Sequence, residues 1–171
     1  MEEIEAKFLE VDVKGLVSKL ESFGAAKVFE GNIVAGYYDF KDGRLRRNRQ
    51  LLRLRTKGDI AELTLKVPIS NEKAKVAEEI EVNVSDADEM EGILAHLGIY
   101  KYDELVKHRM SYSLGGTHFD FDTYPGIPTF LEIEAPSIGE VESYAVRLGV
   151  PVGDAKPWNA RELFEHYKKT I

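Results

Sequence analysis

Residues 51–67 read LLRLRTKGDIAELTLKV, and their alternation predicts two β-strands joined by a tight turn. Leucine recurs at every second position on each side of Gly58-Asp59, and Arg, Glu, Thr or Lys stands between the leucines. Because successive side chains of a strand point to opposite faces, this pattern gives one apolar face and one charged face. A glycine-aspartate pair suits the short loop of a hairpin. The stretch therefore predicts an antiparallel hairpin with a charged side.

The same kind of segment returns along the chain. The triplet Glu-Ile-Glu occurs at 3–5, 79–81 and 132–134, each time in an alternating segment followed by a turn and an amphipathic stretch. Those stretches, at 13–25, 86–99 and 139–150, predict helices because each ends with a glycine after Phe or Leu. Ser85 before Asp88 fits an N-terminal capping box, and a fourth helix is expected over 160–169. With about eight strands, short connections and no linker, the sequence predicts one α+β domain over 1–171.

The period of two places many charged residues on one shared face. The opposite face is apolar in every predicted strand, including Phe119 and Phe121. The charged set consists of Glu3, Glu5, Lys7, Arg53, Arg55, Glu62, Lys66, Glu79, Glu81, Lys107, Arg109, Asp120, Asp122, Glu132 and Glu134.

Two architectures satisfy this pattern. A curved antiparallel sheet can turn its charged face to water. Alternatively, the sheet closes into a barrel whose charges line a hydrated lumen, with the helices packed outside. Periodicity alone favours the solvated sheet, but basic pairs on some strands and acidic pairs on others indicate a face that meets a charged ligand.

The composition excludes several function classes. Without cysteine, the chain has no disulfide, no thiolate metal site and no cysteine nucleophile. A net charge of −7 argues against a general nucleic-acid-binding protein. No apolar run approaches the roughly 18 residues that span a bilayer, and the acidic start lacks the pattern of a signal peptide. We therefore expect a cytoplasmic protein that binds neither nucleic acid nor membrane.

Six sequence motifs whose charged residues lie on this shared face follow one another along the chain. They resemble the CYTH superfamily, the triphosphate tunnel metalloenzymes, which include class IV adenylyl cyclases and thiamine triphosphatases. The motifs are E-x-E-x-K at 3–7, R-x-R at 53–55, T-x-K at 64–66, E-x-E at 79–81, K-x-R at 107–109 and DTYPGIPTFLEIEAP at 122–136.

The resemblance implies an eight-stranded antiparallel closed β-barrel, a triphosphate tunnel with a charged lumen and helices packed outside. Oxygen ligands without cysteine favour a hard ion, Mg²⁺ or Mn²⁺. The expected metal ligands are Glu3, Glu5 and Glu134, followed by Glu132 and Asp122. The residues expected to bind the substrate are Lys7, Arg53, Arg55, Lys66, Lys107 and Arg109.

A tyrosine and a lysine form the expected catalytic pair. Tyr37 resembles the tyrosine that, with the lysine of T-x-K, here Lys66, is proposed to handle the proton in thiamine triphosphatases. A nearby ammonium group would lower the pKa of the phenol toward the working range. The roles of Glu79 and Glu81 stay open between ion pairs with arginine and metal contact, and Asp120 is expected to pair with a lysine.

The leading expectation is a metal-dependent triphosphatase acting on inorganic tripolyphosphate, a nucleoside triphosphate or thiamine triphosphate. The alternative is a class IV-type adenylyl cyclase that makes cyclic AMP and pyrophosphate from ATP. A third reading, a non-catalytic polyphosphate-binding module, has no use for the carboxylates. The expected partner is a small-molecule triphosphate. Relatives are often dimers, so a homodimer is a further possibility.

Overall fold

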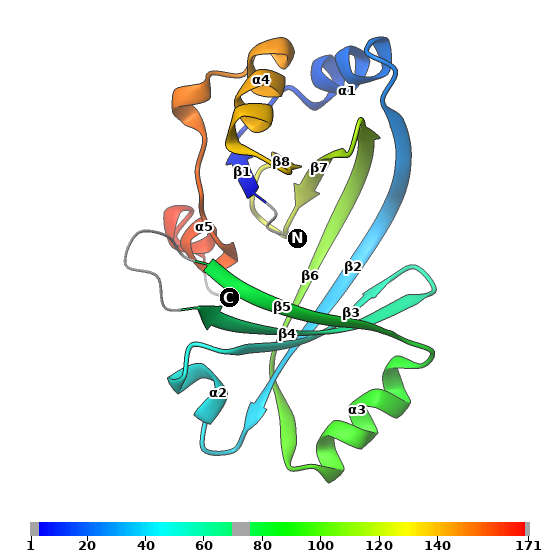
Figure 1. The fold of residues 1–171 in the computed structure, drawn as a ribbon, viewed down its shortest axis with the longest axis vertical. Coiled ribbons are helices and arrows are strands. Elements are labelled where there is room, and N and C mark those ends of the chain that lie inside the picture. The colour runs from blue at the N-terminus through cyan, green and yellow to red at the C-terminus, as the bar shows by residue number, and fades with distance from the viewer. Residues whose placement is uncertain (1–3, 70–75, 170–171) are drawn as a thin grey trace. The chain divides into compact units, whose positions relative to one another are not determined.

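The structure, a computed structural model, describes residues 4–69 and 76–169 (Figure 1). Its strands form an antiparallel sheet in the order β1-β8-β7-β6-β2-β3-β4-β5. The eight strands are β1 (Ile4–Phe8), β2 (Ala26–Phe40), β3 (Leu51–Lys57), β4 (Ile60–Ile69), β5 (Val76–Val84), β6 (Ile99–Leu114), β7 (Thr117–Thr123) and β8 (Phe130–Ala135).

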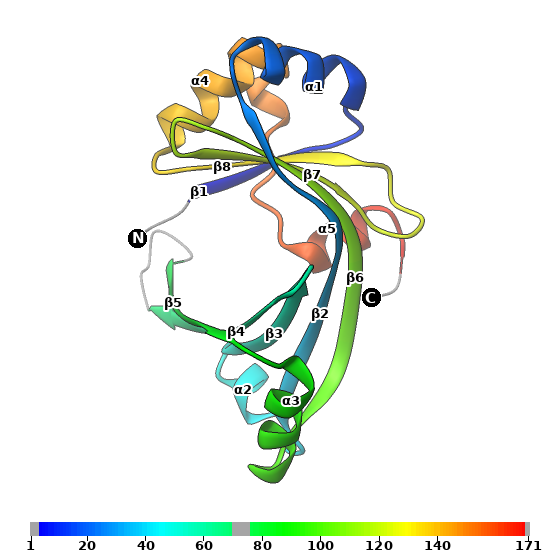
Figure 2. The same ribbon diagram turned by 90° about the vertical axis from the view of Figure 1, so that its right-hand side faces the viewer.

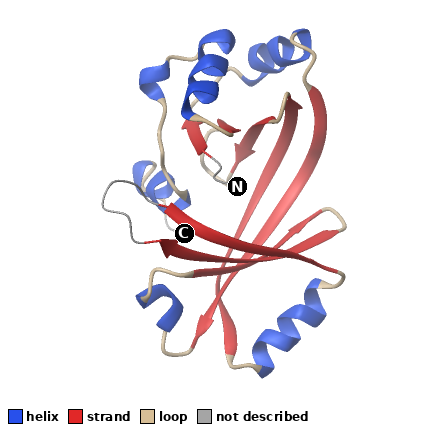
Figure 3. Ribbon diagram, in the orientation of Figure 1, coloured by secondary structure: helices blue, strands red, loops and turns tan. Residues whose placement is uncertain are grey.

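Helices follow the three predicted Glu-Ile-Glu strands, as the sequence indicates (Figure 3). The capping prediction for the second of them was wrong by one residue, because Asp86 accepts the amide protons of Asp88 and Glu89. None of the helices in the described part of the chain is long and apolar enough to cross a membrane. The helices are α1 (Val13–Ser22), α2 (Arg44–Arg47), α3 (Ala87–His96), α4 (Ile138–Leu148), α5 (Ala160–His166) and the short 3-10 helix η1 (Val152–Asp154).

The hairpin predicted at 51–67 is confirmed. Strand β3 ends at Lys57 and β4 begins at Ile60, so Gly58-Asp59 forms the loop, and Gly58 has a φ of 60° that suits glycine. The register pairs Leu52 with Leu65 and Arg53 with Thr64. Apolar residues therefore oppose apolar residues on one face, and polar residues oppose polar residues on the other.

Helix α2 was not predicted, and Asp39 explains why it forms. The buried carboxylate of Asp39 accepts the backbone amides of Phe40 at 2.7 Å, Leu45 at 3.0 Å and Arg46 at 3.1 Å. A carboxylate that satisfies several amides stabilises a tight turn followed by a helical turn. Residues 41–44, KDGR, are typical of a turn, but no local pattern shows that Asp39 caps the helical turn that follows.

The sheet ends at β1 on one side and β5 on the other. Among the described residues no hydrogen-bonded ladder joins these two edge strands, so backbone pairing does not close the sheet. The α+β class and the eight-stranded antiparallel sheet are confirmed. The chain divides into two compact units, which share the long strands β2 and β6, so the single domain over 1–171 stays a prediction.

The first unit comprises Met1–Gly31 and Lys107–Ile171. Figure 2 shows α1 and α4 on one side of β1, β8 and β7. That side of the strands is fully apolar: Phe119, Leu131 and Ile133 are 0% exposed. They pack with Leu20 of α1 and Leu148 of α4 in one core, so the charged parity of these strands points away from the helices.

The second unit comprises Asn32–Val106. Helix α3 packs against β3, and its Leu94 joins Tyr38, Leu52 and Leu54 in a separate buried cluster. Here too the helix packs on the side of the strands that carries the apolar side chains. In each unit, the charged side chains of the strands therefore lie on the side of the sheet that faces away from the helices of that unit, as the alternation predicts.

Candidate functional site

Strands β1 and β8 place four charged side chains opposite one another in the first unit. Their register sets Glu5 across from Glu134 and Lys7 across from Glu132. Opposed residues of an antiparallel pair point to the same face. The residues between them belong to the apolar core. A tight charged cluster therefore forms from two segments that are more than a hundred residues apart in the chain.

Three of these side chains bring carboxylates within reach of a single cation. One oxygen from each of Glu5, Glu132 and Glu134 lies within 4.8 Å of the others. Lys7 Nζ lies 2.9 Å from Glu5 Oε1 and 2.7 Å from Glu132 Oε2. Burial raises the pKa of Glu132, but Lys7 and Arg109 outweigh burial and hold this pKa at about 2. Glu132 is therefore ionised at neutral pH although it is buried.

Arg109 of β6 connects this cluster to β7. Its Nε and Nη2 each lie 2.6 Å from an oxygen of Asp122, and Nη2 also lies 3.0 Å from Glu132 Oε1. Its Nη1 forms an ion pair with Asp120. Burial lowers the pKa of Arg109, but these carboxylates raise it above its ordinary value. Three carboxylates thus hold one buried guanidinium in a fixed orientation.

Asp122 is the most deeply buried ion of the group. Its side chain is 0% exposed, and Lys107 Nζ lies 2.6 Å from its Oδ2 while Arg109 holds both of its oxygens. Burial lowers the pKa of Lys107 more than Asp122 raises it. The positive charges of Lys107 and Arg109 therefore balance the negative charge of Asp122. Asp122 is not one of the three carboxylates that could share one ion, which are Glu5, Glu132 and Glu134.

The first unit brings most of its predicted site residues together. Glu5, Lys7, Glu132 and Glu134 share one cluster, and Lys107, Arg109 and Asp122 form the adjoining one. The expected partner of Asp120 was wrong, because Asp120 pairs with Arg109 rather than with a lysine. Glu3, a predicted metal ligand, lies outside the described residues.

The second unit carries its own charged face on β3, β4 and β5. The register sets Arg55 across from Glu62 and Thr64 across from Glu81. Arg55 and Glu62 form an ion pair, and Arg53 Nη2 lies 3.8 Å from Glu62 Oε1. These pairs are looser than those of the first unit, since the side chains of Arg53, Arg55 and Glu62 are 17%, 24% and 16% exposed.

Thr64 connects the neighbouring strands on this face. It is 0% exposed, receives a hydrogen bond from Arg53 Nη2 at 3.3 Å and donates one to Glu81 Oε2 at 3.2 Å. Sequence reasoning gave Thr64 the right parity but no role in the site. A buried hydroxyl between an arginine and a carboxylate orients both side chains.

Arg53 is the least satisfied cation of this face. Its buried Nε has no hydrogen-bond partner within the described chain. Burial and the neighbouring charge of Arg55 lower the pKa of Arg53. A partly buried guanidinium with one buried, unused donor suits an anion as a partner, because leaving that donor unpaired costs free energy.

Tyr37 and Lys66, the expected catalytic pair, lie on β2 and β4, which β3 separates in the sheet. Lys66 Nζ lies 2.5 Å from Glu79 Oε1, and Tyr37 stands across from Arg53 in the register of β2 and β3. Burial raises the pKa of Tyr37 more than Arg53 and Arg55 lower it. The expected lowering of the phenol pKa was therefore wrong, because burial penalises the phenolate. Glu79 forms an ion pair, but its partner is Lys66 rather than the arginine that this reading expected.

The donor set of the first unit fits a hard divalent ion. Glu5, Glu132 and Glu134 offer only oxygen ligands, and their spacing allows one ion to contact all three. Lys7 lies beside this arrangement as a monovalent cation held by Glu5 and Glu132. The three carboxylates therefore form a site that already binds a cationic group, the ammonium of Lys7.

Comparisons with known proteins agree on the fold. A protein of Methanocaldococcus jannaschii named putative adenylate cyclase is 29% identical over 137 residues, which are 78% of this chain and 77% of the relative. The structure of a protein of Pyrococcus horikoshii OT3 superposes with a TM-score of 0.74 at 24% identity, covering 95% of this chain and 99% of that one. An adenylyl cyclase candidate of Hippeastrum, described as having a dominant triphosphatase activity, superposes with a TM-score of 0.66 at 14% identity, covering 99% and 96%.

The CYTH domain family model matches residues 1–145, which contain every charged motif of both units. The similar solved structures support the tunnel fold of that family, although hydrogen bonds do not close the sheet here. This chain belongs to the CYTH domain family.

Proposed function

We propose that the protein is a metal-dependent triphosphatase that hydrolyses a phosphoanhydride bond of inorganic tripolyphosphate, a nucleoside triphosphate or thiamine triphosphate. The carboxylate cluster of Glu5, Glu132 and Glu134 beside Lys7 carries this proposal. Three carboxylates repel a polyphosphate unless a cation stands between them, so a plain anion-binding module gains nothing from them. The triphosphatase activity ascribed to the Hippeastrum protein supports the same reaction class.

Glu5, Glu132 and Glu134 would hold Mg²⁺ or Mn²⁺, with Glu3 and Asp122 as further predicted ligands. The bound ion would polarise a phosphoryl group and offset the charge that develops on its oxygens. Arg109 supports this arrangement because it holds Glu132 and Asp122 from one side while Lys7 holds Glu132 from the other.

The cations are proposed to bind the phosphate oxygens. Lys7, Arg53, Arg55 and Lys66 supply ammonium and guanidinium donors, which form strong hydrogen bonds with phosphate. Lys107 and Arg109 are also proposed to bind the substrate, although both are held by carboxylates. They serve a second purpose, since these contacts fix the positions of the carboxylates.

Tyr37 is proposed to act with a protonated phenol. Because burial raises the pKa of Tyr37, its hydroxyl keeps its proton at neutral pH and can donate a hydrogen bond. Such a donor suits the leaving phosphate, whose oxygen gains negative charge when the phosphoanhydride bond breaks. Lys66 would bind that phosphate as a point charge.

The alternative is an adenylyl cyclase of class IV type. The name of the Methanocaldococcus jannaschii relative favours it. In that reaction the ribose 3′-hydroxyl attacks the α-phosphate, so cyclic AMP and pyrophosphate form, whereas a triphosphatase uses water as the nucleophile. The products therefore separate the two functions without any assumption about the binding mode.

The test is an activity assay with three substrates and controlled metal. Tripolyphosphate, ATP and thiamine triphosphate are each incubated with Mg²⁺, Mn²⁺ or chelator, and orthophosphate, pyrophosphate and cyclic AMP are measured. We expect metal-dependent orthophosphate release that falls about a hundredfold or more in Glu5→Gln, since a metal ligand is lost. Glu142→Gln, an exposed carboxylate of α4, is the matched control and should keep full activity.

Each result has a definite reading. Cyclic AMP with pyrophosphate would replace the triphosphatase by the cyclase. Ligand binding that ignores metal, together with no turnover of any substrate, would leave only the polyphosphate-binding module.

A further inference from the structure

The segment that joins η1 to α5 attaches to β1, the strand at one edge of the sheet (Figure 1). Lys7 N donates to Lys156 O and Lys156 N donates to Lys7 O, both at 2.9 Å, so these two residues form an antiparallel bridge. Pro157 favours an extended backbone at Lys156 and has no amide proton of its own to pair. A residue more than a hundred positions away thus pairs with the lysine of the carboxylate cluster.

The bridge places the side chain of Lys156 on the charged face of the first unit. Directly opposed residues of an antiparallel pair point to the same face. On its other side Lys7 stands across from Glu132, and Glu132 stands across from Asp120 of β7. A row of charged residues therefore crosses the sheet in the order Lys156, Lys7, Glu132 and Asp120, and Lys156 forms its outer end.

The ammonium of Lys156 differs from its neighbours in what holds it. Lys7, Lys107 and Arg109 are each held by carboxylates. Among the described residues Lys156 has no carboxylate partner, and its Nζ lies 5.8 Å from the centroid of the Trp158 ring. Both side chains are half-buried. An ammonium beside an aromatic ring is kept in place by the ring but retains its N–H donors for an anion.

The charges next to Lys156 cancel without it. The three carboxylates of the cluster are balanced by Lys7 and one divalent ion. Beside them, Lys107 and Arg109 balance the charges of two aspartates. A triphosphate is a polyanion, so it is attracted most strongly by positive charge that no carboxylate offsets. Lys156 supplies such a charge at the edge of the cluster.

We propose that Lys156 is a phosphate-binding residue of this site and that its ammonium donates hydrogen bonds to phosphate oxygens of the substrate. This inference rests on the proposed function, since it takes a triphosphate as the ligand. Lys7, held by Glu5 and Glu132, keeps the carboxylates in place, whereas Lys156 is available to the substrate. Position 156 lies beyond residues 1–145, which the family model matches, so family membership does not assign this role.

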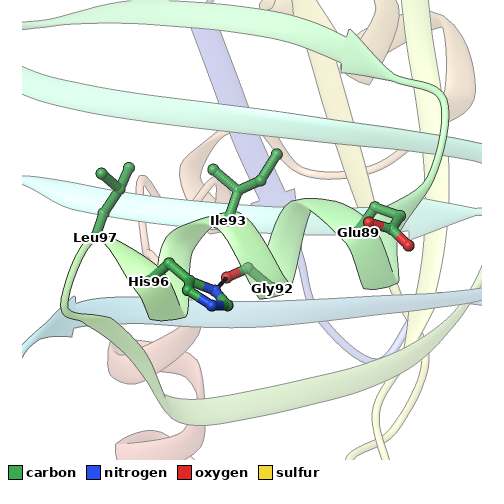
Figure 4. A pocket seen from close by; sticks show the side chains of 5 residues that line it. All are labelled: Glu89, Gly92, Ile93, His96 and Leu97. Atoms are coloured by element: carbon green, nitrogen blue, oxygen red, sulfur yellow. Dashed lines mark hydrogen bonds between the residues drawn. The ribbon is translucent and has the colours of Figure 1, made fainter.

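Two hollows on the surface suit a phosphate less well. Figure 4 shows the hollow beside α3, of about 360 Å³, with a carboxylate and large apolar side chains around it. Its lining consists of Glu89, Gly92, Ile93, His96 and Leu97. A second hollow of about 400 Å³, beside β1 and α1, contains the carboxylates of Glu10, Asp12 and Asp154. Lys19 also lines it, but its Nζ lies 2.6 Å from Leu148 O. Carboxylates repel a phosphate, which favours the site at Lys156.

Calorimetric titration of the full chain with diimidotriphosphate and Mg²⁺ tests the inference. In this compound NH replaces both bridging oxygens of tripolyphosphate, so binding is measured without turnover. Lys156→Gln removes the charge and should lower the affinity about tenfold to a hundredfold, because a charged hydrogen bond is lost. Lys156→Arg keeps a cation that binds phosphate and should stay within about fivefold of the wild type.

Lys14→Gln is the matched control. Lys14 is an exposed lysine of α1, on the opposite side of the strands from the charged face, so its loss should leave the affinity unchanged. The bridge between Lys7 and Lys156 uses backbone atoms alone, so the thermal unfolding midpoint of Lys156→Gln should match that of the wild type. Trp158 is the single tryptophan of the chain, and its fluorescence should change when the analogue binds beside Lys156.

The inference and the proposed function fail in different ways. If the wild type hydrolyses a triphosphate and Lys156→Gln binds the analogue as tightly as Lys14→Gln does, Lys156 is not a phosphate ligand. If no substrate is turned over but Lys156→Gln alone loses affinity, the phosphate contact stands and the catalytic function falls. A loss that appears with the β,γ-imido analogue of ATP and not with diimidotriphosphate would assign Lys156 to the organic group and overturn the inference.

Discussion

The two units carry charged faces of similar composition but different construction. In the first unit the ions are buried and multiply bonded: Arg109 contacts three carboxylates, and Asp122 contacts two cations. In the second unit most ions make single contacts and keep more access to water, and Lys66 and Glu79 are 35% and 43% exposed. Buried ions depend on every partner, whereas exposed pairs are screened. The first face is therefore organised before a ligand arrives, and the second is free to respond to one.

The largest expected effect is the loss of one buried charge in the first unit. Asp122→Asn leaves Lys107 and Arg109 buried with less compensation and should lower the free energy of unfolding by about 3–5 kcal/mol. The matched change in the second unit, Glu62→Gln, should cost about 1 kcal/mol or less. Urea denaturation measures both. Equal losses in the two variants would remove the distinction between the faces.

Acid should weaken the metal-free protein through Glu132. Its pKa is lowered from 4.5 to about 2 in the folded state, so its stabilising effect is complete above pH 4.5 and is lost as the pH falls toward 2. The contribution is on the order of 3 kcal/mol. Urea denaturation in chelator across this range should show a steeper decline for the wild type than for Glu132→Gln. Parallel curves would mean that Glu132 does not carry the effect.

A smaller effect is expected when Arg53 loses its charge, and it should appear in binding rather than in folding. Arg53→Gln removes a guanidinium whose Nε is unused, so the free energy of unfolding should change by about 1 kcal/mol or less. The affinity for tripolyphosphate should fall by about 2 kcal/mol, or roughly thirtyfold, because a charged hydrogen bond is lost. Calorimetric titration gives this affinity. Lost stability with unchanged affinity would make Arg53 structural.

The smallest effect belongs to the ion pair of Lys66 and Glu79. A double-mutant cycle with Lys66→Ala and Glu79→Ala should give a coupling of about 0.2–1 kcal/mol, since both side chains are partly exposed. The coupling should weaken in about 1 M salt, because exposed ion pairs are sensitive to screening. A coupling above about 2 kcal/mol that survives salt would show that this pair is built like those of the first unit.

Local sequence determined much of the fold. The alternation at 51–67 specifies the β3–β4 hairpin, its loop and the face of each side chain, because strand side chains repeat every two residues whatever surrounds them. The glycines after the helices mark their ends, since the backbone there has positive φ, as at Gly149.

For the candidate site too, some features follow from the sequence and others only from the tertiary structure. The sequence by itself determined which residues share the charged face, because parity depends only on position along a strand, and the order of its motifs is that of the CYTH family. Only the tertiary structure decided which charges meet. Lys7 contacts Glu132 because β1 lies beside β8, and Lys66 contacts Glu79 because β4 lies beside β5. Strand order and register fix these partners, and burial then fixes their pKa values, so no local pattern contains them.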